Sequence, residues 1–293
     1  MPANIITREI APLPDRNDAA HKGEVGRIAI IGGCFSEVVM VGAPALAANA
    51  ALRTGAGLVQ MLVPEALRTS VGVLAPCATT RTLPMDADAL MEAVSDFGAD
   101  VVALGPGLGD SLTPEVIIDF LSKLTKPVVL DADGLNQLAA RPGAVLARPQ
   151  RIVMTPHPGE LARLLSNWGI DVVIDARPDS RRSAALALAQ AYGCIVVLKG
   201  RGTVVTNAER LYVNETGNAG MATGGTGDVL TGVIAALIGQ NMDPYEAAIL
   251  GVYLHGLAGD FAAEELGRWS MTALDLVEYL PEAFSEYGMS LGE

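Results

Sequence analysis

Several kinds of residue are scarce in this chain of 293 residues, and each scarcity argues against a class of protein. The three cysteines, Cys34, Cys77 and Cys194, stand far apart without a Cys-x-x-Cys pair, which favours free thiols over a disulfide framework or a zinc site. Lys and Arg number 20 against 33 Asp and Glu, so the net charge of −13 disfavours nucleic acid and anionic membranes as partners. Uncharged stretches such as 38–52 are too short to span a bilayer.

Apolar residues are abundant, because 50% of the chain is hydrophobic. This composition supports a large core and excludes disorder as the main state. No Ser- or Pro-rich linker divides the chain, so we expect one domain over residues 23–293 and an N-terminal arm or short helix over residues 1–22. The first 14 residues show no signal-peptide pattern, which predicts a cytoplasmic protein.

Short runs of Val, Ile and Leu alternate with segments of helical periodicity. Buried parallel strands joined by helices have this pattern, so we expect an α/β fold with a mostly parallel sheet between helices. An antiparallel hairpin is predicted over 203–206 and 210–214, with an all-helical remainder after it. The expected strands are 27–31, 58–63, 100–104, 127–130, 151–154 and 194–198, and the expected helices are 43–54, 114–124, 178–192, 228–239, 244–266 and 272–280.

Four glycine clusters lie at 32–33, 105–109, 199–203 and 217–228, each directly after a predicted strand or hairpin. Ligands bind beyond the carboxyl ends of the strands in an open parallel sheet, so the clusters together predict one shared crevice. Taken alone, each cluster is more typical of a simple turn.

The cluster 217–228 carries the strongest signal. The apolar face of 229–237 predicts a helix that begins just after the glycines and has Asp228 in its first turn. Free N–H groups at such a helix start can bind an anion, and the helix dipole predicts an ionised Asp228 carboxylate at neutral pH. The alternative is an ordinary Asp-capped helix after a flexible loop.

Two common nucleotide-binding patterns and two metal-binding patterns are missing. The clusters match neither the Gly-x-x-x-x-Gly-Lys-Ser/Thr string of a P-loop nor the Gly-x-Gly-x-x-Gly spacing of a dinucleotide turn, and no His-Glu-x-x-His or His-x-x-x-Asp string occurs. His255 and Asp260 are five residues apart and so not on one helical face, which favours structural roles.

Two further corners follow predicted strands. At 155–160, two prolines stiffen the chain, and His157 is either a ligand contact or a turn histidine bonded to backbone, while Glu160 favours the helix start. At 131–136, Asp131 and Asp133 either bind Mg²⁺ or position water, or serve as turn and capping residues.

Two long motifs carry a family resemblance. Residues 220–232 read GMATGGTGDVLTG and residues 251–260 read GVYLHGLAGD. With shorter motifs in matching order, they make about residues 20–280 resemble the ADP/ATP-dependent NAD(P)H-hydrate dehydratases of the ribokinase-like superfamily. The resemblance implies a ribokinase-like three-layer fold with helices on both faces of a mostly parallel sheet. The shorter motifs are 22–23, 32–33, 53–59, 104–109, 131–136, 155–160 and 199–203.

The resemblance also implies the reaction, which is repair of the S-epimer of hydrated NADH and NADPH. ADP or ATP phosphorylates the ring hydroxyl, and loss of phosphate restores the double bond of the nicotinamide ring. Phosphate is a far better leaving group than hydroxide at neutral pH, and Mg²⁺ would shield the phosphates of the nucleotide.

Roles for individual residues follow from the same resemblance. Asp228 takes the proton from the ring hydroxyl, and the N–H groups of Gly225, Thr226 and Gly227 stabilise the transferring phosphoryl group. No metal ligand is assigned. The adenine nucleotide is expected on Lys199, Gly200, Arg201, Gly202, Thr203 and Gly227, and hydrated NAD(P)H on Ala43, Gly105, Gly107, His157 and Asp228.

The sequence departs from the family pattern at two places. Residues 35–40 are not the small, glycine-rich stretch expected there, and Arg201 replaces a small residue, either to contact phosphate or to point to solvent. Two other functions remain open: a ribokinase-like kinase of a hydroxymethyl vitamin precursor, and a nucleotide sensor without turnover. By the resemblance we also expect a homo-oligomer, namely a tetramer, and a separate epimerase acting in the same pathway.

Overall fold

A mostly parallel sheet forms the middle layer of the structure, a computed structural model that describes residues 5–7, 9–144, 146, 148–172, 174–175 and 177–291. Within the described sheet, only the strand Val204–Thr206 runs antiparallel to its neighbours. From edge to edge the strands are β1 (Ile5–Ile6), β12 (Arg210–Val213), β11 (Val204–Thr206), β10 (Ile195–Leu198), β9 (Ile152–Met154), β8 (Val128–Leu130), β7 (Val101–Leu104), β2 (Arg27–Ile31), β5 (Leu58–Val63) and β6 (Thr79–Thr82).

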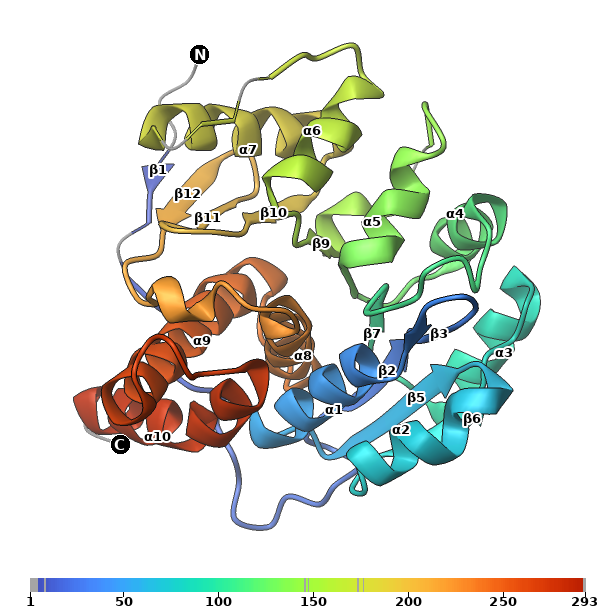
Figure 1. Ribbon diagram of the computed structural model, residues 1–293, viewed down its shortest axis with the longest axis horizontal. Helices are drawn as coiled ribbons and strands as arrows, with labels where there is room; N and C mark the ends of the chain where they lie inside the picture. Colours follow the sequence, from blue (N-terminus) through green and yellow to red (C-terminus); the bar gives the residue numbers. More distant parts are fainter. Residues whose placement is uncertain are drawn as a thin grey trace.

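Helices cover both faces of this sheet (Figure 1). One layer consists of α1 (Gly42–Arg53), α2 (Arg68–Leu74), α8 (Thr226–Gly239), α9 (Pro244–Leu266) and α10 (Ala273–Leu291). The other layer consists of α3 (Ala87–Phe97), α4 (Pro114–Lys123), α5 (Ala132–Ala139), α6 (Pro158–Ser166) and α7 (Pro178–Tyr192).

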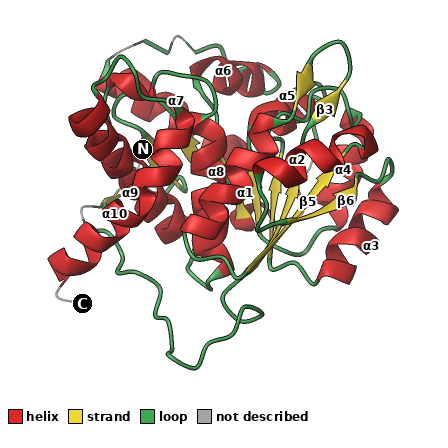
Figure 2. Ribbon diagram, turned by 60° about the horizontal axis from the view of Figure 1, so that its bottom comes forward, coloured by secondary structure: helices red, strands yellow, loops and turns green. Residues whose placement is uncertain are grey.

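Two apolar cores result, one on each face of the sheet. Strands β7, β8, β9 and β10 are buried along their whole length, because side chains on alternate sides enter different cores. Figure 2 shows the strands running between the two helical layers. The predicted three-layer α/β fold is therefore confirmed, as are the six parallel strands, to within one residue, and the antiparallel hairpin.

Several elements differ from the prediction. The sequence pattern did not reveal α2, α3 or α5, since their short apolar stripes lie close to turn residues. Helix α10 was expected to end before Pro281, but it continues to Leu291 because Ala283 and Tyr287 beyond the proline are buried. The loss of one backbone hydrogen bond at Pro281 is outweighed by this burial.

The N-terminal arm contributes an edge strand, because β1 pairs in parallel with β12. Among the described residues of 1–22 no helix occurs, while residues 1–4 and 8 lie outside the described residues. The hydroxyl of Tyr287 donates to the carbonyls of Ile10 and Ala11, which ties the arm to α10. Across the described part of the chain, no helix combines the length and the apolar character needed to cross a membrane.

The chain reverses its direction across the sheet at β2. From β2 it proceeds through β5 to β6 on one side, and it then returns to β7 on the other side. In such sheets the ligand crevice lies between the two strands where the order reverses. The loops after β2 and β7 contact each other there, since the Gly33 N–H donates to the Pro106 carbonyl at 3.0 Å. A small hairpin, β3 (Cys34–Phe35) and β4 (Val39–Met40), follows β2.

Candidate functional site

The carboxyl ends of β2, β7, β8, β9 and β10 lie at one edge of the sheet, because these neighbouring strands all pair in parallel. The segments that follow these strands are the ones for which the sequence analysis predicted a shared crevice. The structure places them along this one edge, as expected for a parallel sheet. The start of α8 reaches the same edge, because a β-carbon on Gly227 would lie 3.2 Å from Lys199 Nζ. The five segments are 32–33, 105–109, 131–136, 155–160 and 199–203, of which 132–136 and 158–160 already belong to the first turns of α5 and α6.

The loop after β7 depends on glycine for its shape. Gly105 has φ +122°, and a β-carbon there would lie 1.9 Å from the carbonyl oxygen of Asp131. Gly107 has φ +60°, and its β-carbon would lie 2.9 Å from that of Ala43 in α1. The structure therefore brings these three predicted substrate contacts, Ala43, Gly105 and Gly107, into one packed group.

Helix α8 begins without a side-chain cap. Its N-cap residue, Gly225, has φ +94°, a conformation that favours glycine. The N–H groups of Thr226, Gly227 and Asp228 have no acceptor within the helix because they lie in its first turn. The Thr226 hydroxyl is bonded to two backbone carbonyls of the preceding loop, at 3.1 and 3.2 Å. The backbone N–H groups are thus the donors that this helix start offers to an anion.

A buried ion pair lies behind this helix start. Asp131 is 1% exposed, and its Oδ1 lies 2.5 Å from Lys199 Nζ. The Thr231 hydroxyl donates to Asp131 Oδ2 at 2.8 Å. Burial opposes the charge of Lys199, but the carboxylates of Asp131, Glu160 and Asp228 outweigh burial and raise the lysine pKa. Asp131 makes no capping bond to α5, so the capping alternative for this residue is wrong.

Asp228 lies in the first turn of α8, as predicted, but its pKa moves in the direction opposite to our expectation. Burial, and next the charge of Asp131, raise this pKa to about 7, while Lys199 acts against them. The helix dipole alone predicted an ionised carboxylate at neutral pH, whereas with a pKa of about 7 roughly half of the Asp228 side chains are protonated at pH 7. A carboxyl group with a pKa near 7 both accepts and releases protons at neutral pH, which suits a general base.

His157 caps α6 together with Glu160. Its Nδ1 accepts hydrogen bonds from the N–H groups of Gly159 and Glu160 at 3.0 and 3.4 Å, and its own N–H donates to Glu160 Oε2 at 2.8 Å. Burial, followed by the charges of Lys199 and Arg163, lowers the pKa of His157, so the ring is neutral at pH 7. The turn-histidine alternative thus describes Nδ1. Nε2 lies 3.4 Å from Glu160 Oε1, the side chain is half exposed, and the ligand contact stays a prediction.

The loop after β10 is closed by its own hydrogen bond. Gly200 and Gly202 have φ +128° and +64°, and the Thr203 hydroxyl donates to the Gly200 carbonyl at 2.9 Å. The Arg201 side chain is exposed. The two positive φ angles and this hydrogen bond therefore define the shape of the loop.

Arg181 in α7 supports this loop, and the sequence analysis missed it. It is 9% exposed, and its Nη2 donates to the carbonyls of Leu198 and Lys199 at 3.2 and 3.1 Å. A signal was present in the sequence, because Arg181 stands three and four residues before the buried Ala184 and Ala185. A charged residue on the apolar stripe of a helix indicates a specific buried partner.

His255 and Asp260 in α9 hold the segment that leads to α8. Asp260 accepts hydrogen bonds from the Gly217 N–H at 2.8 Å and from Asn218 Nδ2 at 3.0 Å. Burial lowers the pKa of His255 to about 4, so its neutral ring donates from Nε2 to the Thr226 carbonyl at 2.9 Å. These contacts agree with the structural roles predicted for both residues.

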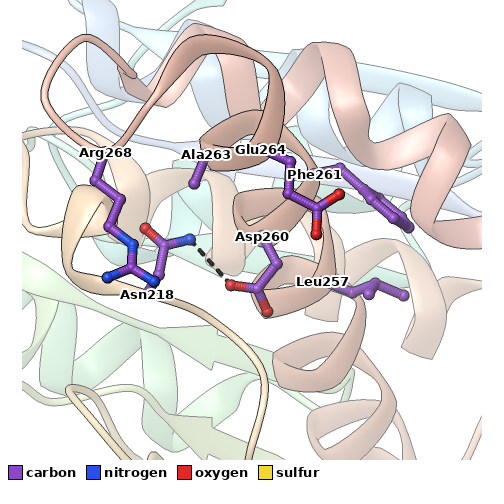
Figure 3. A pocket seen from close by; sticks show the side chains of 7 residues that line it. All are labelled: Asn218, Leu257, Asp260, Phe261, Ala263, Glu264 and Arg268. Atoms are coloured by element: carbon purple, nitrogen blue, oxygen red, sulfur yellow. Dashed lines mark hydrogen bonds between the residues drawn. The ribbon is translucent and has the colours of Figure 1, made fainter.

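A pocket of about 410 Å³ lies against α9, outside the convergence of loops (Figure 3). The polar ends of Asn218, Asp260 and Arg268 lie together in it. No residue that the sequence analysis assigned to nucleotide, substrate or catalysis lines this pocket. The full lining is Asn218, Leu257, Asp260, Phe261, Ala263, Glu264 and Arg268.

The described residues contain no group of three or more His, Cys, Asp or Glu side chains placed to hold a metal ion. Near α8, Asp131 is paired with Lys199, and Asp133 accepts hydrogen bonds from the Gly109 N–H at 2.7 Å and from Asn136. An Mg²⁺ ion at this site would therefore take most of its ligands from nucleotide phosphates and water.

The strand order, the two helical layers and the glycine-rich start of α8 define a ribokinase-like α/β protein. A family model described as NAD(P)H-hydrate dehydratase matches residues 28–282. The chain belongs to the NAD(P)H-hydrate dehydratase family.

Relatives that are named NAD(P)H-hydrate repair enzymes or dehydratases align with most of this chain. The bifunctional NAD(P)H-hydrate repair enzyme of Moorella thermoacetica is 42% identical over 283 residues, which cover 92% of this chain and 51% of that protein. The ADP-dependent (S)-NAD(P)H-hydrate dehydratase of Neisseria meningitidis is 36% identical over 255 residues, covering 86% of this chain and 82% of that protein. The chain thus spans about half the length of the bifunctional relatives it matches.

A solved structure shares the fold over nearly the whole chain. It is the ADP/ATP-dependent NAD(P)H-hydrate dehydratase of Bacillus subtilis, co-crystallised with ATP and Mg²⁺. The two structures superimpose with a TM-score of 0.79 and 30% sequence identity, covering 94% of this chain and 95% of the other.

Proposed function

We propose that the chain catalyses the ADP- or ATP-dependent dehydration of the S-epimer of hydrated NADH and NADPH. The observation that carries this proposal is the position of Asp228, a half-buried carboxyl group in the first turn of a helix with unsatisfied N–H groups, where its pKa is raised to about 7. Phosphorylation of an alcohol needs a base whose pKa is near neutral and a group that binds the phosphate anion, and the start of α8 offers both. Family membership supports the identity of the substrate.

In the proposed mechanism, Asp228 accepts the proton of the ring hydroxyl while the hydroxyl oxygen attacks the terminal phosphorus of the nucleotide. The bond between that phosphorus and its bridging oxygen breaks, and AMP leaves from ADP, or ADP from ATP. The N–H groups of Gly225, Thr226 and Gly227 stabilise the charge on the transferring phosphoryl group. The bond between ring carbon and phosphate oxygen then breaks with electrons supplied by the ring nitrogen. The adjacent ring carbon loses a proton, and the double bond is restored.

We assign the two ligands to the two sides of Asp131. The nucleotide lies on 199–203 and Gly227, whereas hydrated NAD(P)H lies on Ala43, Gly105, Gly107 and His157. The contacts of Asp131 support this arrangement, since its carbonyl adjoins Gly105 and its carboxylate holds Lys199. Mg²⁺ would bind with the nucleotide phosphates and neutralise their charge, in keeping with the ATP and Mg²⁺ used for the Bacillus subtilis relative.

Hydrated NADH mixed with the protein and either ADP or ATP tests the proposal directly. We expect the absorbance of the reduced nicotinamide ring to recover with at least one of the two nucleotides. A stable phosphorylated product would instead identify a kinase of the ribokinase type. Nucleotide binding with no product from any hydrated or hydroxymethyl substrate would identify a sensor.

The pH dependence of turnover follows from the raised pKa of Asp228. A protonated Asp228 cannot accept the hydroxyl proton, so kcat/KM is expected to fall as the pH drops through about 7, by about tenfold for each unit below it. Steady-state rates between pH 5.5 and 9 measure this limb, with nucleotide affinity followed over the same range as a control. If kcat/KM stays constant between pH 6 and 8 while nucleotide affinity is also constant, Asp228 is not the general base.

Thr203→Val is expected to weaken nucleotide binding by about 2- to 13-fold. The variant removes the hydroxyl that closes the loop on the Gly200 carbonyl, and the loss of one hydrogen bond costs about 0.5–1.5 kcal/mol. Calorimetric titration with ADP and ATP measures the effect, and Thr203→Ser, which keeps the hydroxyl, is the matched control. Equal affinities for the parent and a folded Thr203→Val variant would remove this loop from the site.

We also infer a homo-oligomer, specifically a tetramer. Three large apolar side chains close together in the sequence are exposed: Trp269 fully, Leu266 to 42% and Leu274 to 63%. Exposed apolar patches often mark subunit interfaces. Sedimentation of the purified chain tests this, and a monomer at micromolar concentration would overturn it. A separate epimerase and a cytoplasmic location stay predictions.

A further inference from the structure

Asp131 is held in place more firmly than a turn residue needs to be. Its backbone N–H donates to the Leu104 carbonyl at 3.0 Å, and its carbonyl accepts from the Gly134 N–H at 2.9 Å. The next residue, Ala132, has φ +47°, a left-handed conformation that is uncommon for alanine and is stable only where its surroundings impose it. The buried carboxylate of Asp131 is thus fixed at the end of β8.

This carboxylate joins three separate elements. It contacts Lys199 after β10 through Oδ1 and Thr231 in α8 through Oδ2. A β-carbon on Gly227 would lie 3.2 Å from Lys199 Nζ and 3.7 Å from Asp131 Oδ2, so the ion pair lies directly against the first turn of α8. Asp131 itself is assigned as a contact of neither the nucleotide nor the substrate.

We propose that Asp131 is a positioning residue for the phosphoryl transfer, and that it holds the Lys199 ammonium at the start of α8 and sets the charge that Asp228 faces. This inference rests on the proposed function. Removal of the Asp131 charge would leave Lys199 beside Asp228 without the carboxylate bonded to it. An opposite charge favours the ionised form of a carboxyl group and makes it a weaker base.

Other charged and titratable groups face this pair from the neighbouring elements. Asp133 in α5 raises the pKa of Asp228 further. Glu160 in α6 is buried, burial raises its pKa, and its charge acts on Lys199. His157 and His255 have lowered pKa values and are neutral at pH 7. Asp131 is the group bonded to Lys199 itself, so we expect its removal to change the field at Asp228 most.

The test is Asp131→Asn, which keeps the volume of the side chain and removes its charge. At pH 8 we expect kcat to fall at least tenfold, and the acid limb of kcat/KM to move to lower pH by about one to three units. The carboxyl carbon of Asp228, followed by NMR in the nucleotide-free protein, is expected to titrate at correspondingly lower pH. Thr231→Val is the matched control, because it removes the other bond to Asp131 without a change of charge, so its acid limb is expected to stay at the parent position.

An Asp131→Asn variant with the acid limb and the Asp228 titration of the parent would overturn the proposal. If this variant fails to fold, Asp131→Glu replaces it: the charge is kept but displaced, so we expect kcat to fall while the acid limb stays, and a kcat equal to that of the parent would overturn the positioning role. Absence of turnover in the parent itself would count against the proposed function. The NMR titration still decides on Asp131 in that case.

Discussion

Asp228→Asn is expected to lower kcat for hydrated NADH by a factor of about 10²–10⁴, which is the range for loss of a general base. Asparagine has nearly the same size and also stabilises a helix start, so the fold is expected to persist. It cannot accept the proton of the ring hydroxyl. Rapid-mixing absorbance assays at saturating nucleotide measure kcat, and calorimetry measures nucleotide affinity, which is expected to be retained.

The same variant is expected to be more stable than the parent above pH 7. The folded pKa of Asp228 is about 7 and the unfolded pKa about 3.9, so between these values the folded state binds more protons than the unfolded state. The parent therefore loses stability as the pH rises from about 4 to 7, and the loss is complete above 7. A neutral asparagine avoids this loss, which we put on the order of 2–4 kcal/mol at pH 8. Urea denaturation of the parent and of Asp228→Asn at pH 5 and pH 8 measures this difference, which is expected to be larger at pH 8.

Asp179→Asn provides the control for both effects. Asp179 also lies in the first turn of a helix, α7, but it is exposed and pairs only loosely with Arg182 at 3.6 Å. Its replacement is expected to leave kcat unchanged and to alter stability by less than about 1 kcal/mol. Turnover by a folded Asp228→Asn protein close to the parent rate would identify Asp228 as a helix residue only. The base would then have to be sought among Asp131, Asp133 and Glu160.

The strands and the convergence of loops were predictable because both depend on local sequence. A run such as Val101–Leu104 is apolar on both faces, and its glycine-rich continuation marks the end of the strand. Parallel strands then bring such ends to one edge of the sheet, so the sequence alone predicts the loops that hold Gly105 and Lys199 at the same edge.

The charges within the site were not predictable in the same way. The pairing of Asp131 with Lys199 joins residues 68 positions apart, and no periodicity relates them. The pKa of Asp228 depends on burial and on a neighbouring carboxylate, whereas sequence reasoning had only the helix dipole. The bonding of His157 to backbone was one of the two predicted alternatives, but its part in a capping box was not specified because histidine is not among the common N-cap residues. Glu160 does stand at the position typical of a capping box.

Gly105→Ala is expected to lower the free energy of unfolding by roughly 2–6 kcal/mol, from the strain of alanine at positive φ together with overpacking. The added β-carbon would lie 1.9 Å from the Asp131 carbonyl oxygen, and this is rigid backbone at the end of β8. Relief of the clash requires movement of Asp131, which would also disturb the Lys199 ion pair, so activity is expected to fall even under conditions where the variant is folded.

Gly42→Ala is the matched substitution, because Gly42 is the exposed first residue of α1 and nothing lies within 4 Å of its added β-carbon. Alanine restricts the unfolded chain more than glycine does, so this variant is expected to match the parent or gain up to about 1 kcal/mol. Urea denaturation of the parent and both variants gives the comparison. Equal urea midpoints for Gly105→Ala and Gly42→Ala would show that the loop after β7 can shift away from Asp131 at no cost in stability. The packing of this loop against Asp131 would then no longer support the proposed site.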